Sequence, residues 1–272
     1  MSFLDDRLAR LGLASDVRTA VARQAALVSI EAGGCLERRG SRPEAVWYTA
    51  SGLVSSRVGL AGGTHGTLVL FGPDTWFNEG VAPFDLPMVV DIVALAPTSA
   101  FRISAAAYRR LLVEHPLFMR AMLEMAAFRM VRQLQVLVAF KHGSPTFRVA
   151  FTLAHFAGSF DPSSGFTARQ DPQGEIQVDA SAGLFAQIAN VSRSVLLEVL
   201  VPLERAGFIE HRYGRLIFTP QRPVWLALMR QLSVANPLPA RWSVGQLIAE
   251  LEALRSQIGT AASQTPHHGL AA

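Results

Sequence analysis

The sequence predicts an α+β protein in which an antiparallel β-domain precedes a long helix and a C-terminal helix-turn-helix with a β-hairpin. Short apolar runs between Ile30 and Phe101 alternate with Gly, Pro, Asp and Asn clusters, as in an all-β sandwich or barrel. From Pro116 the apolar residues follow a helical period for several turns. Between Ala182 and Thr219, two short helical patterns lead into a strand–turn–strand pattern.

Length and composition limit the classes to which the chain can belong. Its 272 residues suffice for two domains, and the net charge of +4 favours a localised basic face. The longest uncharged run, Val58–Pro73, is interrupted by glycines, and acidic residues follow Met1, so we expect neither a membrane partner nor a signal peptide, and a cytoplasmic location. A single cysteine, Cys35, excludes an iron–sulfur cluster held by four cysteines.

The N-terminal part, residues 1–103, is predicted to be a β-domain preceded by helices. Apolar spacing over Asp5–Ser29 predicts two short helices broken at Gly12, with Ser15 and Asp16 capping the second. The strands that we expect are Val46–Tyr48, Leu53–Val58, Thr67–Phe71, Val89–Leu95 and Ser99–Ile103.

A long helix is predicted over residues 104–141. Ser104 is placed to cap a first segment, Ala105–Glu114, and Pro116 opens a longer one that extends to about Phe140. Apolar residues spaced four and three apart form a heptad seam along it, which favours pairing with a second copy. Packing of the same stripe against the protein's own β-domain is the alternative. The seam consists of Leu123, Ala127, Met130, Leu134 and Leu137.

The third part, residues 142–234, begins at a break in the helical pattern, Lys141–Pro145, which we interpret as a hinge. A helix over Thr146–Phe160 with Ser144 as its cap is expected, followed by a loop over Asp161–Gln173 and a strand over Glu175–Val178. After the hairpin, Val224–Leu232 is predicted to be helical. In the last part, residues 235–272, we expect an amphipathic helix over Ser243–Ile258 and disorder over Gly259–Ala272.

The helix-turn-helix pattern gives the first functional hypothesis. Asp179 or Ser181 is placed to cap the first helix, and Ser192 is placed to cap the second. The leading end of the second helix, Ser192-Arg193-Ser194, is the part that such a motif inserts into the DNA major groove. The Arg193 guanidinium suits guanine O6 and N7 or a phosphate. An ordinary helical hairpin with a solvated arginine is the alternative.

A basic hairpin directly after the second helix strengthens the DNA-binding hypothesis. Strands over Phe208–Arg212 and Arg215–Thr219 flank the turn Tyr213-Gly214, so Arg212 and Arg215 come at its tip. A hairpin in this position is typical of the wing of a winged helix, whose cations contact phosphates.

The order of these parts resembles the CRP/FNR family of bacterial transcription regulators over about Ile30–Pro220. Matching motifs are the segment Gly33–Gly40 with Tyr48 and Gly52, the cassette Gly72–Gly80, and Gln187–Arg193 in the helix-turn-helix. The resemblance implies a jelly-roll β-domain that senses a small effector. It also implies a homodimer that changes the presentation of its recognition helices, with RNA polymerase as a further partner. A two-fold dimer would present two copies of Arg193 to successive major grooves, so we expect a near-palindromic operator on double-stranded DNA.

The expected effector site departs from the family pattern. Cyclic-nucleotide-binding members continue the cassette into an Arg-Ser pair that holds the cyclic phosphate, whereas this chain has Pro87-Met88-Val89 there. Burying a phosphate without a cation is costly, so cyclic AMP is disfavoured and the effector is unknown. The candidate effector-binding residues are Trp76, Phe77, Asn78, Glu79, Met88, Val89, Arg132 and Gln133.

The recognition helix also departs from the family pattern. Glu198 puts a carboxylate where a base-reading arginine often lies, and Leu197 is apolar where the family is usually polar. The DNA-binding residues implied are Ser192, Arg193, Ser194, Leu197, Glu198, Arg212 and Arg215. A second hypothesis is therefore a ligand-binding or protein-interaction module whose helix-turn-helix no longer reads DNA.

Catalysis and metal chemistry have little support in the sequence. The motifs HExxH, GxSxG and the Walker loop are absent, so no catalytic or metal-binding residues are predicted. His65 as a haem ligand and Cys35 as a redox sensor are minor alternatives to a solvated loop histidine and an unreactive thiol.

Overall fold

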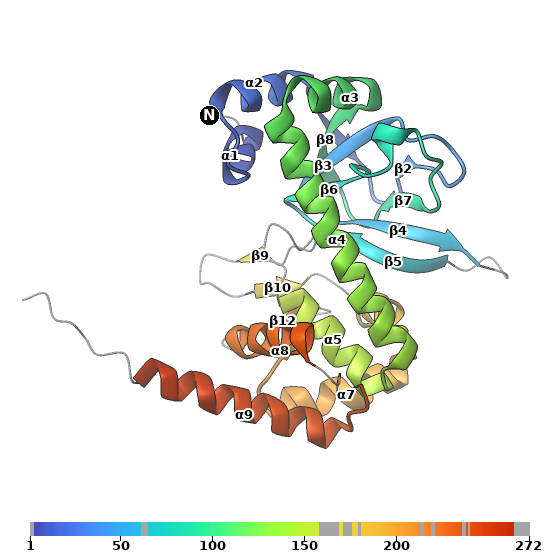
Figure 1. The fold of residues 1–272 in the computed structure, drawn as a ribbon. Coiled ribbons are helices and arrows are strands. Elements are labelled where there is room, and N and C mark those ends of the chain that lie inside the picture. The colour runs from blue at the N-terminus through green and yellow to red at the C-terminus, as the bar shows by residue number, and fades with distance from the viewer. Residues whose placement is uncertain are drawn as a thin grey trace, which may run out of the picture. The chain divides into compact units, whose positions relative to one another are not determined.

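A computed structural model of the chain describes residues 3–60, 65–157, 169–170, 176–178, 181–212, 215–218, 221–235, 238 and 240–263 (Figure 1). The described residues form two compact units, residues 3–134 and residues 135–263, and the division falls inside the long helix. Each unit is described by itself below.

The first unit is built on two antiparallel four-stranded sheets. One has the order β1 (Ala25–Ile30), β8 (Thr98–Ser104), β3 (Ala45–Ser51), β6 (Thr75–Phe77). The other has the order β2 (Cys35–Glu37), β7 (Asp91–Ala94), β4 (Val54–Gly59), β5 (His65–Phe71). The strand order and antiparallel pairing agree with the expected jelly-roll, and all five predicted strands are present.

The inner core lies between the two sheets because alternate residues of each strand point inward. Trp47 of β3 and Phe77 of β6 are partners in the strand register, and their rings stack at 6.3 Å. The cluster consists of Ala45, Trp47, Val54, Phe71, Phe77, Met88, Ile92 and Ala100.

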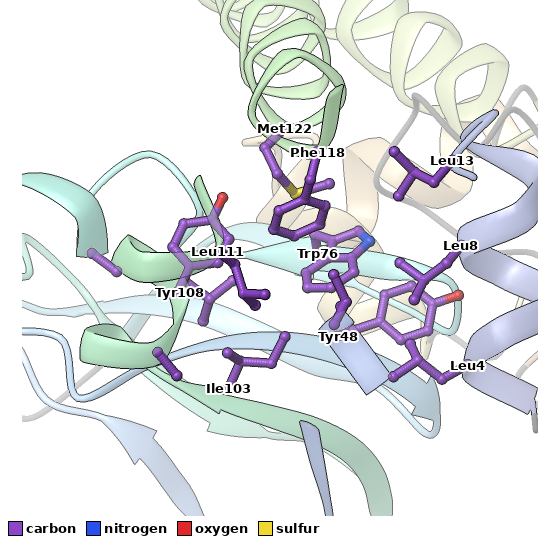
Figure 2. Packing of buried hydrophobic residues seen from close by; sticks show 14 of the residues in the cluster. Leu4, Leu8, Leu13, Tyr48, Trp76, Ile103, Tyr108, Leu111, Phe118 and Met122 are labelled. Carbon is purple, nitrogen blue, oxygen red and sulfur yellow. The ribbon is translucent and has the colours of Figure 1, made fainter. Parts of the chain in front are cut away.

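A second core covers the outer face of the sheet that contains β3. Tyr48 and Trp76 alternate with the inner-core residues, and their rings lie 5.0 Å apart (Figure 2). Helices α1 (Phe3–Arg10), α2 (Ser15–Gln24), α3 (Ala105–Glu114) and the start of α4 (Pro116–His142) supply the opposing side chains. Because both faces of β3 are covered, all residues from Ala45 to Thr49 are buried. The labelled residues of this outer core are Leu4, Leu8, Leu13, Tyr48, Trp76, Ile103, Tyr108, Leu111, Phe118 and Met122.

The N-terminal prediction was wrong in two details. Residues Ala25–Ile30 form β1 and not the end of a helix, because they pair with β8 along its whole length, and Leu27 is exposed. The N-cap of α2 is Ala14, which has no side-chain hydrogen bond, so neither Ser15 nor Asp16 caps it. The short strands β2 and β6 were not predicted.

The helical boundaries after β8 agree closely with the sequence. Ser104 caps α3 by accepting a hydrogen bond from the Ala107 amide, as predicted. Helix α4 begins at Pro116 and extends to His142, two residues beyond the expected end.

The second unit contains the last turns of α4, a helical group and a small antiparallel sheet. Helices α5 (Pro145–Ala157), α6 (Ala182–Ile188), α7 (Arg193–Arg205) and α8 (Arg222–Val234) form the group. The sheet has the order β11 (Glu210–Arg212), β12 (Arg215–Ile217), β10 (Ile176–Val178), β9 (Arg169–Gln170). Trp225 of α8 is fully buried, and its Nε1 donates to the Phe208 carbonyl at 2.9 Å.

The C-terminal helix α9 (Val244–Ser263) packs against α5, α7 and α8 (Figure 1). It continues past Ile258, so the expected disorder is wrong for residues 259–263, and the rest of that segment lies outside the described residues. The loop expected over Asp161–Gln173 also lies mostly outside them, except that Arg169–Gln170 form β9.

In the described part of the chain, no single helix is long and apolar enough to cross a membrane. The pair α6 and α7 meets that length and composition test only when joined across a 105° bend.

Candidate nucleic-acid interface

Helices α6 and α7 have the geometry of a helix-turn-helix. Their axes are bent by 105°, within the range usual for this motif. Ser181 caps α6 by accepting from the Leu184 amide, and Ser192 caps α7 by accepting from the Val195 amide. The turn is possible because Asn190 adopts φ +51°, a left-handed conformation that asparagine tolerates. The predicted caps at Ser181 and Ser192 are confirmed.

The two faces of α7 differ in chemistry. Leu196, Val199, Leu200 and Leu203 are buried against the unit, which fixes the helix. Ser192, Arg193, Ser194 and Glu198 are exposed, and Leu197 is 41% exposed. The Ser192 and Ser194 hydroxyls lie 2.9 Å apart.

The leading end of α7 is electropositive. Arg193 is the first residue of the helix, where unpaired backbone amides and the helix dipole already give a partial positive charge. The first turn contains no acidic residue that would neutralise this charge. A cation there costs helix stability, and an anionic partner would offset that cost.

The hairpin after α7 has the position of a wing. Strands β11 and β12 pair with Arg212 opposite Arg215, and β10 extends the sheet on the other side of β12. Glu204 near the end of α7 accepts from the His211 amide at 3.0 Å and so ties the hairpin to the helix. The turn Tyr213-Gly214 lies outside the described residues.

The heptad seam of α4 is exposed. Leu123, Met130, Leu134 and Leu137 are 67%, 59%, 55% and 59% exposed, and Ala127 is exposed too. The residues of α4 that pack on the β-domain are instead Phe118, Met122 and Met125, on a different face of the helix.

The expected effector residues do not lie together: some belong to two separate hydrophobic cores and others are exposed. Trp76 belongs to the outer core, while Phe77 and Met88 belong to the inner core. Asn78 is buried at φ +68° and donates from Nδ2 to the Ala45 carbonyl at 3.3 Å. Val89 is 76% exposed, Arg132 is half-buried and Gln133 is exposed.

Glu79 is buried and has a partner on α4 that the sequence did not predict. Arg129 places both terminal guanidinium nitrogens 3.3 Å from the Glu79 carboxylate, and it donates to the Trp76 carbonyl at 2.6 Å. The guanidinium carbon also lies 5.8 Å from the Phe71 ring centre. Arg129 therefore fixes the cassette to the long helix. Arg132, which the resemblance implies as an effector residue, lies one helical turn from Arg129. The sequence carries no signal that Glu79 is buried against α4.

We expect replacement of Arg129 by methionine to lower the free energy of unfolding by about 3 kcal/mol. Removing one member of a buried ion pair leaves the other charge uncompensated, which costs about 3–5 kcal/mol. The lower value applies here because the Arg129 side chain is 20% exposed. Chemical denaturation would measure it. The control is Arg120→Met, because Arg120 and Glu124 form an exposed pair on the same helix, worth less than about 1 kcal/mol. Equal effects of the two substitutions would contradict the role given to Arg129.

The metal-binding and redox alternatives concern groups of His, Cys, Asp and Glu side chains and the single thiol, Cys35. Among the residues that the structure describes, no group of three or more His, Cys, Asp or Glu side chains is placed to hold a metal ion. Desolvation raises the pKa of the Cys35 thiol and outweighs the lowering effect of Arg38. A raised pKa disfavours the reactive thiolate that a redox sensor needs.

The chain thus consists of a β-roll unit and a winged helix-turn-helix unit, and the long helix α4 runs from one into the other. No protein-family model and no curated protein sequence matches it. Its fold is similar to that of solved structures. FixK2 from Bradyrhizobium japonicum matches with a TM-score of 0.62 and 15% identity, over 78% of this chain and 98% of that one.

Two further solved structures have a similar fold. TTHA1359, a CRP/FNR family transcriptional regulator from Thermus thermophilus, matches with a TM-score of 0.57 and 16% identity, over 77% of this chain and 99% of that one. The c-di-GMP responsive regulator CLP from Xanthomonas campestris matches with a TM-score of 0.57 and 18% identity, over 75% of this chain and 99% of that one. The chain has the fold of the CRP/FNR transcriptional regulators, which confirms the predicted fold class.

Proposed function

We propose that the chain is a DNA-binding transcription regulator that binds a near-palindromic operator as a dimer and responds to a small effector other than cyclic AMP. DNA and RNA polymerase are its proposed partners, and the cytoplasm is its proposed location. The observation that carries the proposal is the exposed Arg193 at the electropositive start of α7, on a helix whose opposite face is buried.

The exposed apolar seam of α4, together with the exposed leading end of α7, supports DNA binding by a dimer. A row of apolar side chains along α4 that are half or more exposed to water is typical of a surface that another protein covers. The spacing of four and three suits a second copy of the same helix. Two-fold pairing would present two copies of α7 to successive major grooves.

A DNA-binding assay separates this function from the alternative. Duplexes of random sequence would be titrated with the full chain at several salt concentrations. Binding that weakens steeply with salt is expected, because phosphate contacts release counterions. Absent or salt-insensitive binding by a folded protein would favour the interaction module, for which the exposed Leu197 is the supporting observation.

Cyclic AMP is expected not to bind. Met88 is buried among apolar residues and Val89 is an exposed apolar side chain, so neither supplies a cation or hydroxyl for the cyclic phosphate. Calorimetric titration of the full chain with cyclic AMP should show no saturable binding in the micromolar range. Saturable micromolar binding would contradict the effector part of the proposal.

A further inference from the structure

The segment between α8 and α9 is attached to the junction of α4 and α5. The Ser144 amide donates to the Ala240 carbonyl at 2.7 Å. The Ser144 hydroxyl donates to the Trp242 carbonyl at 3.0 Å and accepts from the Phe147 amide at 3.2 Å, so it also caps α5, as predicted. The Trp242 ring lies 5.4 Å from the Phe147 ring. The hydrogen bond between Ser144 and Trp242 therefore joins residues that are 98 positions apart in the sequence.

From this attachment α9 extends to the far end of the recognition helix. Leu247, Leu251 and Leu254 are buried against the helical group. The Arg255 guanidinium lies 4.8 Å from the ring centre of Phe208, which follows α7. Gln231 of α8 donates to Glu250 at 2.6 Å. One continuous C-terminal segment therefore contacts both the α4–α5 junction and the residue that links α7 to the hairpin.

The junction between α4 and α5 is tightly packed around Gly143. A Cβ on Gly143 would lie 2.3 Å from the Ala139 carbonyl oxygen and 2.7 Å from the Phe147 ring, so only glycine fits between the last turn of α4 and α5. The last turns of α4, including the seam residue Leu137, belong to the same compact unit as α7. The end of the proposed dimer seam and Arg193 are thus fixed with respect to one another within one unit.

We propose that the C-terminal segment from Ala240 to Ser263 is a positioning element for DNA binding. By holding the end of α4 against α5 and by supporting α7 at Phe208, it fixes the separation of the two recognition helices and hence the half-site spacing that the dimer accepts. This inference rests on the proposed function. Trp242, Ser144 and Arg255 act through the position of α7 and not by touching DNA.

The test is a selection of operators in which two copies of the preferred half-site are separated by spacers of different length. The full-length wild-type protein should enrich one spacing. Trp242→Ala keeps the backbone carbonyl that accepts from Ser144 but removes the indole that packs on Phe147. The preference for that spacing over its neighbours should then fall about tenfold, near the upper end of what an aromatic contact contributes. Affinity for an isolated half-site should change much less. Gln257→Ala, on the exposed face of α9, is the matched control.

Hydrogen exchange at the Ser144 amide supplies a readout without DNA. Exchange should be slow in the wild type and the control, and faster in Trp242→Ala and in the milder variant Trp242→Leu. Faster exchange with an unchanged spacing preference would contradict the positioning role but not the proposed function as a transcription regulator. Slow exchange in the Trp242 variants overturns the attachment itself. Absence of DNA binding by a wild-type protein with a protected Ser144 amide overturns the proposed function instead.

Discussion

Replacing Arg193 with alanine should weaken binding to operator DNA by about 1–3 kcal/mol per half-site, or roughly 5- to 150-fold. Arg193 is exposed at the start of α7, whereas the apolar residues that hold the helix are on the opposite face, so the substitution should leave the fold intact. Titrations at several salt concentrations would measure both the affinity and its salt dependence. Weakening confined to the operator assigns Arg193 to base reading, and equal weakening on all sequences assigns it to phosphate contact.

Arg230→Ala is the matched control, because Arg230 is an exposed arginine of α8 in the same unit. It should change operator affinity by less than about 0.5 kcal/mol, the usual effect of a surface substitution. If Arg193→Ala and Arg230→Ala weaken binding equally, DNA is attracted by net charge alone, and the recognition role of α7 is wrong.

Replacing Leu134 with glutamate should convert the proposed dimer into monomers and abolish operator binding at concentrations where the wild type binds. Leu134 is 55% exposed in the single chain, so a carboxylate there costs the monomer little. In a paired seam it would be desolvated opposite its own copy, where like charges repel and the apolar contact of about 2 kcal/mol per side chain is lost. Sedimentation velocity would give the oligomeric state.

Gln135→Glu introduces the same charge one residue away, at a partly exposed polar position outside the apolar seam. This control should remain dimeric and bind DNA. A monomeric wild-type protein, or a dimer that survives Leu134→Glu, would show that α4 is not the dimer contact.

Much of the fold could be predicted because local signals were strong. Ser104, Ser144, Ser181 and Ser192 each precede an apolar helical pattern, and each caps the helix that it was expected to cap. The strand β1 could not be found in this way. Its apolar residues Ala25–Ile30 continue the helical spacing of α2, and only pairing with β8, some 70 residues later in the register, makes them a strand.

The sites were predictable to different degrees. The recognition helix is a contiguous stretch, so its exposed and buried faces follow from a period of 3.6 residues. The surroundings of Glu79 depend on a helix 50 positions away, and nothing in the spacing of α4 distinguishes Arg129 from Arg132. The expected effector residues Trp76 and Phe77 are neighbours in sequence, but adjacent residues of β6 point to opposite faces of the sheet and so belong to different cores.

The tryptophans give each unit its own spectroscopic signal. All four are described, with Trp47 and Trp76 in the β-roll unit and Trp225 and Trp242 in the winged unit. Trp47 donates its indole N–H to the buried Glu37, while Trp225 donates to a backbone carbonyl, so the two indoles experience different electric fields. Intrinsic fluorescence of variants that retain only one pair of indoles would therefore follow the melting of either unit without an attached dye.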